Sequence, residues 1–190
     1  MAESAFAVNV PEAESYVAVL RERFDPSAKL GVPAHITLLY PFMSPEQITE
    51  MVLKRVRLAL SPAVRFRFCL VRTGRFPGAL YLAPEPAEPF IALTERLVHQ
   101  FPDYLPYGGQ HGSIVPHLTV AQASEAEHSV AEAELARILP LPSGIQASCK
   151  EVVLIENSSG RWEHMHSFSL AARAANPSMQ PIGRSRSAAD

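Results

Sequence analysis

A tetrapeptide occurs twice in this chain: His-Ile-Thr-Leu at positions 35–38 returns as His-Leu-Thr-Val at positions 117–120. Each copy follows closely after a proline and continues into a strand-like run. Because successive side chains of a strand point to opposite faces, each copy places its His and Thr on one face and its two apolar residues on the other. The repeat therefore predicts two strands that are buried on one face and present a polar pair on the other.

The elements expected around the two copies follow one order. Strand, helix, histidine strand, helix and strand are predicted over 6–71, and the same order returns over 79–156. The predicted ranges are 6–10, 11–24, 35–40, 44–60 and 63–71 in the first copy and 79–83, 90–101, 117–122, 125–139 and 150–156 in the second, with a closing strand at 161–170. This pattern indicates an internal duplication into two lobes, about 5–75 and 76–171. An approximate two-fold axis between such lobes would bring the two His-x-Thr pairs face to face.

A cleft with two imidazoles and two hydroxyls holds the minimum set of groups for metal-free acid–base chemistry on a phosphodiester. One neutral imidazole can take a proton from attacking water, while the other, as imidazolium, donates a proton to the leaving oxygen. The hydroxyls and the cationic ring then stabilise the charge of the transition state. Because a two-fold site lets either ring fill either role, the sequence leaves open which histidine is the base.

Composition narrows the class of protein. A length of 190 residues with 47% apolar residues supports a single domain over 1–175, followed by a tail, 176–190, that is predicted to be disordered. The formal net charge of −2 argues against broad charge-driven binding to nucleic acid, so double-stranded DNA is not an expected partner. Cys69 and Cys149 are too few for a disulfide framework or a thiolate zinc site, which favours a reduced, cytoplasmic location. No run reaches the roughly 18 apolar residues that span a bilayer, so no membrane partner is expected.

Over about 6–170 the chain resembles the two-histidine (2H) phosphoesterase superfamily, which includes RNA 2′,3′-cyclic phosphodiesterases and the 2′-5′ RNA ligases. The two His-x-Thr-x motifs, each in the same order of elements, carry this resemblance. It implies an α+β, bilobal fold in which two antiparallel sheets, with helices outside, surround a central cleft lined by the motifs. It also implies reactions that open or form 2′,3′-cyclic phosphates or 2′-5′ linkages without a metal or other cofactor.

By this resemblance His35 and His117 are the catalytic acid–base pair, and Thr37 and Thr119 bind the phosphoryl oxygens. The expected substrate is a small nucleotide or an RNA terminus, and the expected protein is a monomer. Three functions stay open at this point: hydrolysis of the phosphodiester, the ligase reaction in which an RNA hydroxyl replaces water, and binding of a nucleotide or RNA end without chemistry. The same four residues would serve the first two.

Four further residues are candidate substrate contacts: Tyr40, Arg75, Tyr107 and His111. The two tyrosines have the faces on which a base can stack, although core packing is an alternative for Tyr40. Arg75, like its neighbour Arg72, has the charge to contact a second phosphate, with a solvated turn as the alternative. His111 lies in a glycine-rich loop just before the second motif.

The remaining histidines and the tryptophan have less specific patterns. His164 and His166 share a predicted strand face, but no spacing typical of a metal motif accompanies them, so no metal site is expected. His99 and His128 fall on predicted helices and are expected to be solvated. Trp162 is predicted to be a packing residue.

Overall fold

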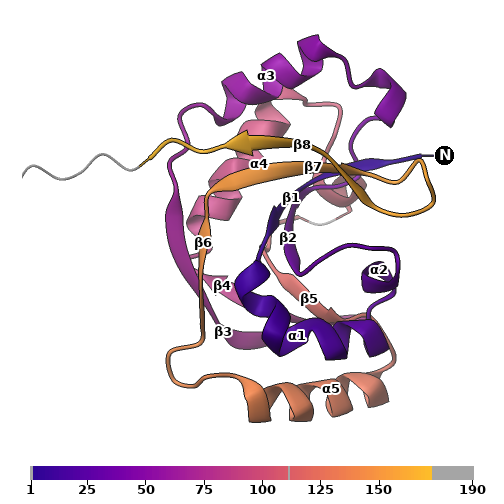
Figure 1. Ribbon diagram of the computed structural model, residues 1–190, viewed down its shortest axis with the longest axis vertical. Coiled ribbons are helices and arrows are strands. Elements are labelled where there is room, and N and C mark those ends of the chain that lie inside the picture. Colours follow the sequence, from indigo (N-terminus) through magenta and orange to yellow (C-terminus); the bar gives the residue numbers. More distant parts are fainter. Residues whose placement is uncertain (1, 111, 173–190) are drawn as a thin grey trace, which may run out of the picture.

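The computed structural model describes residues 2–110 and 112–172, and over these residues the chain forms two four-stranded antiparallel sheets with helices outside them (Figure 1). The strands are β1 (Ser4–Asn9), β2 (His35–Leu39), β3 (Phe66–Phe76), β4 (Ala79–Glu85), β5 (Leu118–Ala121), β6 (Ile145–Cys149), β7 (Glu151–Glu156) and β8 (Glu163–Ser169). The helices are α1 (Pro11–Phe24), α2 (Pro26–Lys29), α3 (Glu50–Leu60), α4 (Glu88–Gln100) and α5 (Glu125–Ile138), with short 3₁₀ turns η1 (Pro45–Gln47) and η2 (Pro106–Gly109). The predicted fold class is thereby confirmed. His111 and the predicted tail, 176–190, lie outside the described residues.

The two sheets exchange strands between the halves of the sequence. One has the order β2-β1-β7-β8 and the other the order β5-β4-β3-β6, so the last strand of each repeat joins the sheet that holds the other repeat's histidine strand. The sheets therefore do not follow the predicted lobe boundaries. The cause is local: only Pro77 and Gly78 separate β3 from β4, and a two-residue connection makes the two strands an antiparallel hairpin. Gly78 supplies the positive φ, +80°, that such a turn requires.

The helices show the same exchange. Helix α1 of the first repeat packs against α5 of the second and against β5, whereas α3 packs against α4, which contacts β2 (Figure 1). Each histidine strand is thus supported by a helix from the other half of the chain. Among the described residues, no helix is both long enough and apolar enough to cross a membrane.

Aromatic side chains fill much of the main core. Phe6 contacts Phe42 and Phe168, with ring centroids 4.8 and 6.1 Å apart, and Phe90 meets Phe66 and Phe68 edge-on at 4.9 Å each. A second, smaller apolar cluster covers the other face of the β2-β1-β7-β8 sheet and consists of Ala5, Ala7, Val32, Val153 and Ile155, with Tyr40 and Trp162 packed against it. Strand β1 is consequently buried on both faces.

One predicted helix begins later in the structure, and one strand of the structure was not predicted. The helix predicted from 44 begins at Glu50 instead, because Ile48 and Thr49 adopt extended backbone angles and the Thr49 hydroxyl caps the helix by accepting the N–H of Val52. Residues 45–47 form only the 3₁₀ turn η1. Strand β6 was not predicted at all; its small and polar residues resemble a connecting loop, although Ile145, Ala147 and Cys149 alternate into the core.

Candidate active site

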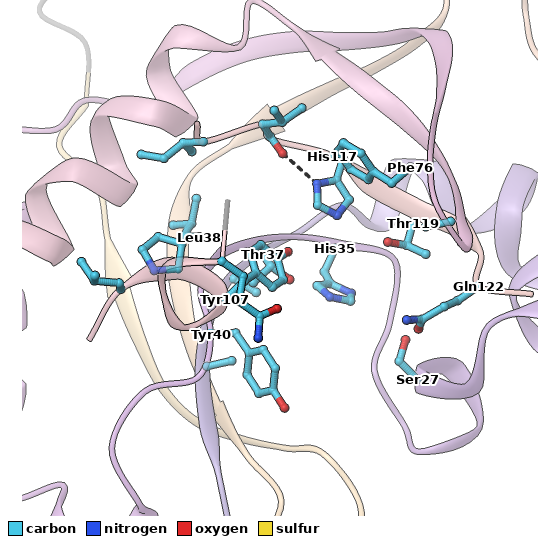
Figure 2. Close-up of a pocket in the computed structure, with 18 of the residues that line it drawn as sticks. Ser27, His35, Thr37, Leu38, Tyr40, Phe76, Tyr107, His117, Thr119 and Gln122 are labelled. Atoms are coloured by element: carbon cyan, nitrogen blue, oxygen red, sulfur yellow. Dashed lines mark hydrogen bonds between the residues drawn. The ribbon is translucent and has the colours of Figure 1, made fainter. Parts of the chain in front are cut away.

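The two His-x-Thr motifs lie on strands at the ends of the two sheets, and these strands, β2 and β5, contact each other. Their side chains alternate in the same way: His and Thr are half-buried, and the apolar residues between and after them are buried. All four polar residues, His35, Thr37, His117 and Thr119, line one cavity of about 1350 Å³ (Figure 2). The structure therefore brings the two predicted pairs together.

Both imidazoles are held in the same way. The Nδ1 atom of His35 lies 2.8 Å from the carbonyl oxygen of Pro33, and the Nδ1 atom of His117 lies 2.7 Å from that of Val115, in each case two residues upstream. A carbonyl oxygen only accepts hydrogen bonds, so Nδ1 carries the proton in both rings. The Nε2 atom of each ring is left as the one that can exchange a proton with a ligand in the cavity.

The surroundings of His35 favour its neutral form. Burial is the main cause that lowers the pKa of His35 to about 4, and the hydrogen bond to Pro33 opposes this effect. Among the charged groups, Arg21 and His117 lower the pKa further and Asp25 raises it. At neutral pH the ring is therefore uncharged, with a lone pair on Nε2, which is the state of a proton acceptor.

Aromatic rings surround His117. Phe76 meets its ring edge-on at 5.1 Å, Tyr81 lies tilted at 5.3 Å, and Tyr107 stacks at 6.3 Å with an interplanar angle of 23°. The absence of a side chain at Gly74 makes room for this arrangement, because a Cβ atom there would overlap the Tyr81 ring. The position of His117 thus depends on the packing of the β3–β4 hairpin.

Two of the predicted substrate contacts, Tyr40 and Tyr107, line the cavity. The Tyr40 hydroxyl donates to Glu3 at 2.8 Å, and burial together with this carboxylate raises the pKa of Tyr40 to about 12. Tyr107 has a positive φ of 52°, its N–H donates to the carbonyl of Tyr40, and its hydroxyl shares a hydrogen bond with Thr37. Burial raises the pKa of Tyr107 as well. Both rings are therefore fixed, uncharged aromatic surfaces.

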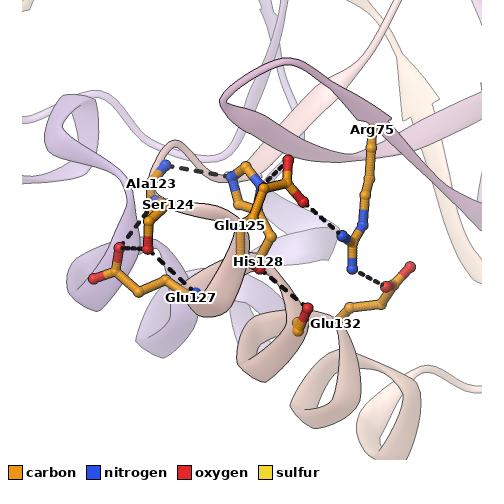
Figure 3. Close-up of polar contacts among 8 residues, drawn as sticks. Arg75, Ala123, Ser124, Glu125, Glu127, His128 and Glu132 are labelled. Carbon is orange, nitrogen blue, oxygen red and sulfur yellow. Dashed lines mark hydrogen bonds and ion pairs between the residues drawn. The ribbon is translucent and has the colours of Figure 1, made fainter.

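Arg75 does not line the cavity. Its guanidinium donates to Glu125 at 3.1 Å and to Glu132 at 2.5 Å, both on α5 (Figure 3). Arg72 pairs with Glu85. The geometry does not support the substrate contact that we predicted for Arg75, because β3 turns this side chain toward α5 rather than toward the histidines.

The prediction for His128 was wrong. This side chain is fully buried on α5, where Nε2 accepts the N–H of Ala123 at 3.3 Å and Nδ1 lies 3.8 Å from Glu125 (Figure 3). The ring folds back over the capped first turn of α5, so a helical position that looked peripheral belongs to the interior. His99 is exposed, as predicted, and so is His164, whereas His166 is half-buried. Within residues 2–110 and 112–172, no three His, Cys, Asp or Glu side chains are grouped in a way that could hold a metal ion.

Six polar residues of the described cavity lining were not predicted from the sequence: Asp25, Ser27, Glu95, Gln110, Ser113 and Gln122. Figure 2 shows the Ser27 hydroxyl and the Gln122 amide on the Thr119 side of the cavity. Asp25 caps α2 by accepting the N–H of Ser27 at 3.0 Å. The run Asp-Pro-Ser is a typical helix start, so the capping pattern was the available signal, but it does not show that this turn faces the motifs.

Similar proteins are known from curated sequences. Proteins named "Putative phosphoesterase" from Bacillus cytotoxicus and Bacillus mycoides are 34% and 31% identical to this chain over 114 residues. Each match covers 58% of this chain and 63% of the relative. The chain therefore spans less than two thirds of the length of these relatives.

Similar folds are known from solved structures. Escherichia coli LigT in complex with 3′-AMP has a TM-score of 0.56 at 19% identity, covering 88% of this chain and 97% of LigT. The Thermus thermophilus protein TT0787 also has a TM-score of 0.56, at 22% identity, covering 90% of this chain and 98% of that protein. At these identities the similarity establishes the LigT-like fold.

The family that matches is described as the 2′-5′ RNA ligase superfamily, and the match extends over residues 9–161. This segment contains both His-x-Thr motifs and strands β2 to β7 of the two sheets that place them. The two-histidine resemblance predicted from the motifs is thereby confirmed, and the chain belongs to the 2′-5′ RNA ligase superfamily of 2H phosphoesterases.

Proposed function

We propose that this protein is a metal-independent phosphodiesterase that hydrolyses a 2′,3′-cyclic phosphate or a related ribose phosphodiester. The observation that carries the proposal is the matched pair of imidazoles, each fixed through Nδ1 by a carbonyl two residues upstream, in one cavity with two threonine hydroxyls. A cyclic phosphate needs one group to accept a proton from water and another to donate a proton to the leaving oxygen. Two rings that are anchored in the same way through Nδ1, and that exchange protons through Nε2, provide both.

In the proposed reaction Nε2 of His35 takes a proton from a water molecule as its oxygen forms a bond to phosphorus. The bond from phosphorus to one ribose oxygen breaks, and Nε2 of His117, as imidazolium, donates its proton to that oxygen. The hydroxyls of Thr37 and Thr119 donate to the non-bridging oxygens as charge develops on them. The product is a phosphomonoester with a free vicinal hydroxyl, and proton exchange with solvent resets the two rings. The lowered pKa of His35 supports its assignment as the base.

The family description also names a 2′-5′ RNA ligase. In the ligase reaction that we consider, an RNA hydroxyl would take the place of water. The same two histidines would exchange the same two protons in that reaction, with the 2′-5′ linkage as the product. We keep this transfer as the second candidate because the chemistry at phosphorus is shared, and because product analysis separates the two reactions directly.

The proposal is tested by incubating the protein with adenosine, guanosine, cytidine and uridine 2′,3′-cyclic phosphates in the presence of EDTA. We expect turnover that is unchanged by the chelator, with a single nucleoside monophosphate isomer as the product. Chromatography of the products against 2′- and 3′-monophosphate standards identifies the bond that breaks. Calorimetry on the same four compounds measures nucleotide binding. Binding without turnover would contradict the phosphodiesterase proposal and would favour a protein that binds a nucleotide or RNA end without chemistry.

The lining of the cavity favours a small nucleotide as the substrate. The apolar cluster on β1 and β7 forms one wall, where Ala5, Ala7 and Ile155 lie beside the rings of Tyr40 and Trp162, which meet edge-on at 6.0 Å. Among the described lining residues, none is Lys or Arg. A planar base suits the apolar wall, and a single phosphodiester charge suits the histidine pair. LigT, which has the same fold, was crystallised with 3′-AMP, with ATP and with NADP⁺.

Replacing Trp162 by Ala is expected to raise the KM for adenosine 2′,3′-cyclic phosphate by about 5- to 150-fold, because stacking of one base is worth about 1–3 kcal/mol. The kcat should change little, since an indole ring that stacks on the base takes no part in the proton transfers. Steady-state kinetics on the wild type, Trp162→Ala and the ring-preserving control Trp162→Phe measure the effect. Methyl riboside 2,3-cyclic phosphate, which has no base, is the control substrate, and an equal rise in its KM would show that Trp162 acts only through packing.

A further inference from the structure

A buried ion pair lies at the end of α1. The side chains of Arg21 and Asp25 are 2% and 1% exposed, and a guanidinium nitrogen of Arg21 is 2.9 Å from Oδ2 of Asp25. Nε of Arg21 donates to the same oxygen at 3.0 Å. Neither residue belongs to the two His-x-Thr motifs, and the proposed proton transfers do not use them.

The pair is connected to the cavity wall through Ser27. Oδ1 of Asp25 accepts from the N–H and the hydroxyl of Ser27, at 3.0 and 2.8 Å, and Arg21 donates to the Ser27 oxygen at 3.2 Å. Asp25 and Ser27 line the same cavity as His35. The guanidinium group of Arg21 is therefore hydrogen-bonded directly to residues that line the candidate active site.

Burial of this pair is not explained by stability alone. Removing two charges from water costs several kcal/mol for each ion, and well-packed apolar residues of similar volume are often equally stable. The two charges are opposite and both act on His35, whose pKa Arg21 lowers and Asp25 raises. Removing either charge therefore leaves the other to act on the ring without compensation. In the described part of the chain, the ionisable groups that act on His35 or line its cavity are Arg21, Asp25, Tyr40, Glu95, Tyr107 and His117.

We propose that Arg21 and Asp25 are positioning residues that set the protonation of His35, with Arg21 opposing a proton on the ring and Asp25 limiting that effect. The pair lies in and directly behind the wall of the cavity that His35 lines. An uncharged ring is the state that accepts a proton from water, so the pair supports the role of base that we propose for His35. The consequence for catalysis rests on the proposed function, whereas the effect on the ring itself does not.

The test is a titration of the His35 ring followed by ¹³C NMR at Cε1, with assignment through His35→Gln. In Arg21→Met the Asp25 carboxylate is left uncompensated, so the pKa of His35 is expected to rise from about 4 by about one pH unit. In Asp25→Asn the guanidinium is left uncompensated, and the pKa is expected to fall. The matched control is Arg23→Met on the same helix, which removes a surface pair with Glu134 and should leave the titration unchanged.

Each single variant leaves a buried charge unpaired, so circular dichroism first establishes that the protein is folded. Arg21→Met and Asp25→Asn have opposite expected signs, and either one alone decides the question. If neither folds, the double variant is used, since it leaves no unpaired charge. The effect of Arg21 on His35 exceeds that of Asp25, so the expected pKa in the double variant lies between those of the wild type and Arg21→Met.

An unchanged His35 titration in the folded variants would overturn this inference. The acid limb of the pH–rate profile for the cyclic phosphate is expected to move with the NMR titration. If the wild type has no turnover but the titration moves as expected, the proposed function fails and the role of the ion pair stands. If turnover is present and the titration does not move, the proposed function stands and the role of the ion pair fails.

Discussion

Turnover of a nucleoside 2′,3′-cyclic phosphate is expected to fall by about 10²- to 10⁴-fold when either His35 or His117 is replaced by alanine, because each replacement removes one of the two proton transfers. Both side chains are half-buried and face an open cavity, so the fold should be retained. Measurement of kcat/KM with EDTA present, together with circular dichroism of each variant, checks the expectation. The double variant should lose little more than the single variants, since the two rings act as one unit.

The matched control is His164→Ala, which removes an exposed histidine that bonds only to Ser167 at 2.9 Å on β8. Its activity should equal that of the wild type. Thr37→Ala and Thr119→Ala should cost less than the histidine variants, because a hydroxyl that binds phosphate contributes less than a proton-transfer group. Substantial turnover in the double histidine variant would show that the chemistry takes place elsewhere.

The second large effect concerns stability in acid. The pKa of His35 is about 4 in the folded protein and about 6.5 in the unfolded chain, so between these pH values the unfolded state binds more protons. The contribution of His35 to the free energy of unfolding is therefore complete above pH 6.5 and is lost as the pH falls through 4. Its size is roughly 2–3 kcal/mol, with allowance for the part of the ring that faces the open cavity.

This contribution is measured as a difference between wild type and His35→Gln, which has no group that titrates at this position. Urea unfolding at pH 7, 5.5 and 4 should show the wild type losing more stability than the variant as the pH falls. Other acidic groups titrate in both proteins and cancel in the difference. Parallel losses in the two proteins would mean that the folded state does not resist protonation of this ring.

The sequence predicted those parts of the fold that depend on local pattern. The alternation at 35–38 and 117–120 fixed both the strands and the faces of their side chains, and Pro11 with the acidic residues after it fixed the start of α1. The exchange of β3 and β7 between sheets was not predictable, because strand pairing depends on contacts between distant segments. The short turn at Pro77 and Gly78 was the one local sign of it.

The same distinction between local pattern and contacts of distant segments applies to the residues of the candidate site. The His-x-Thr pairs are visible in the sequence because they repeat. Asp25 and Ser27 are not, because their place in the cavity depends on the packing of α1 against β5, which the sequence pattern does not show. The prediction for Arg75 failed for a related reason. Its guanidinium forms ion pairs with two glutamates of α5, and the direction of the side chain depends on the fold rather than on the local sequence.

The interleaving of the two halves has a mechanical consequence. Each half of the chain supplies strands to both sheets, and the hydrogen-bonded pairs β1–β7 and β3–β4 join the first half to the second. Neither sheet can open or shift as a unit that belongs to one half alone. A shift of one sheet against the other, which would change the spacing of the two imidazoles, therefore involves strands from both halves of the chain.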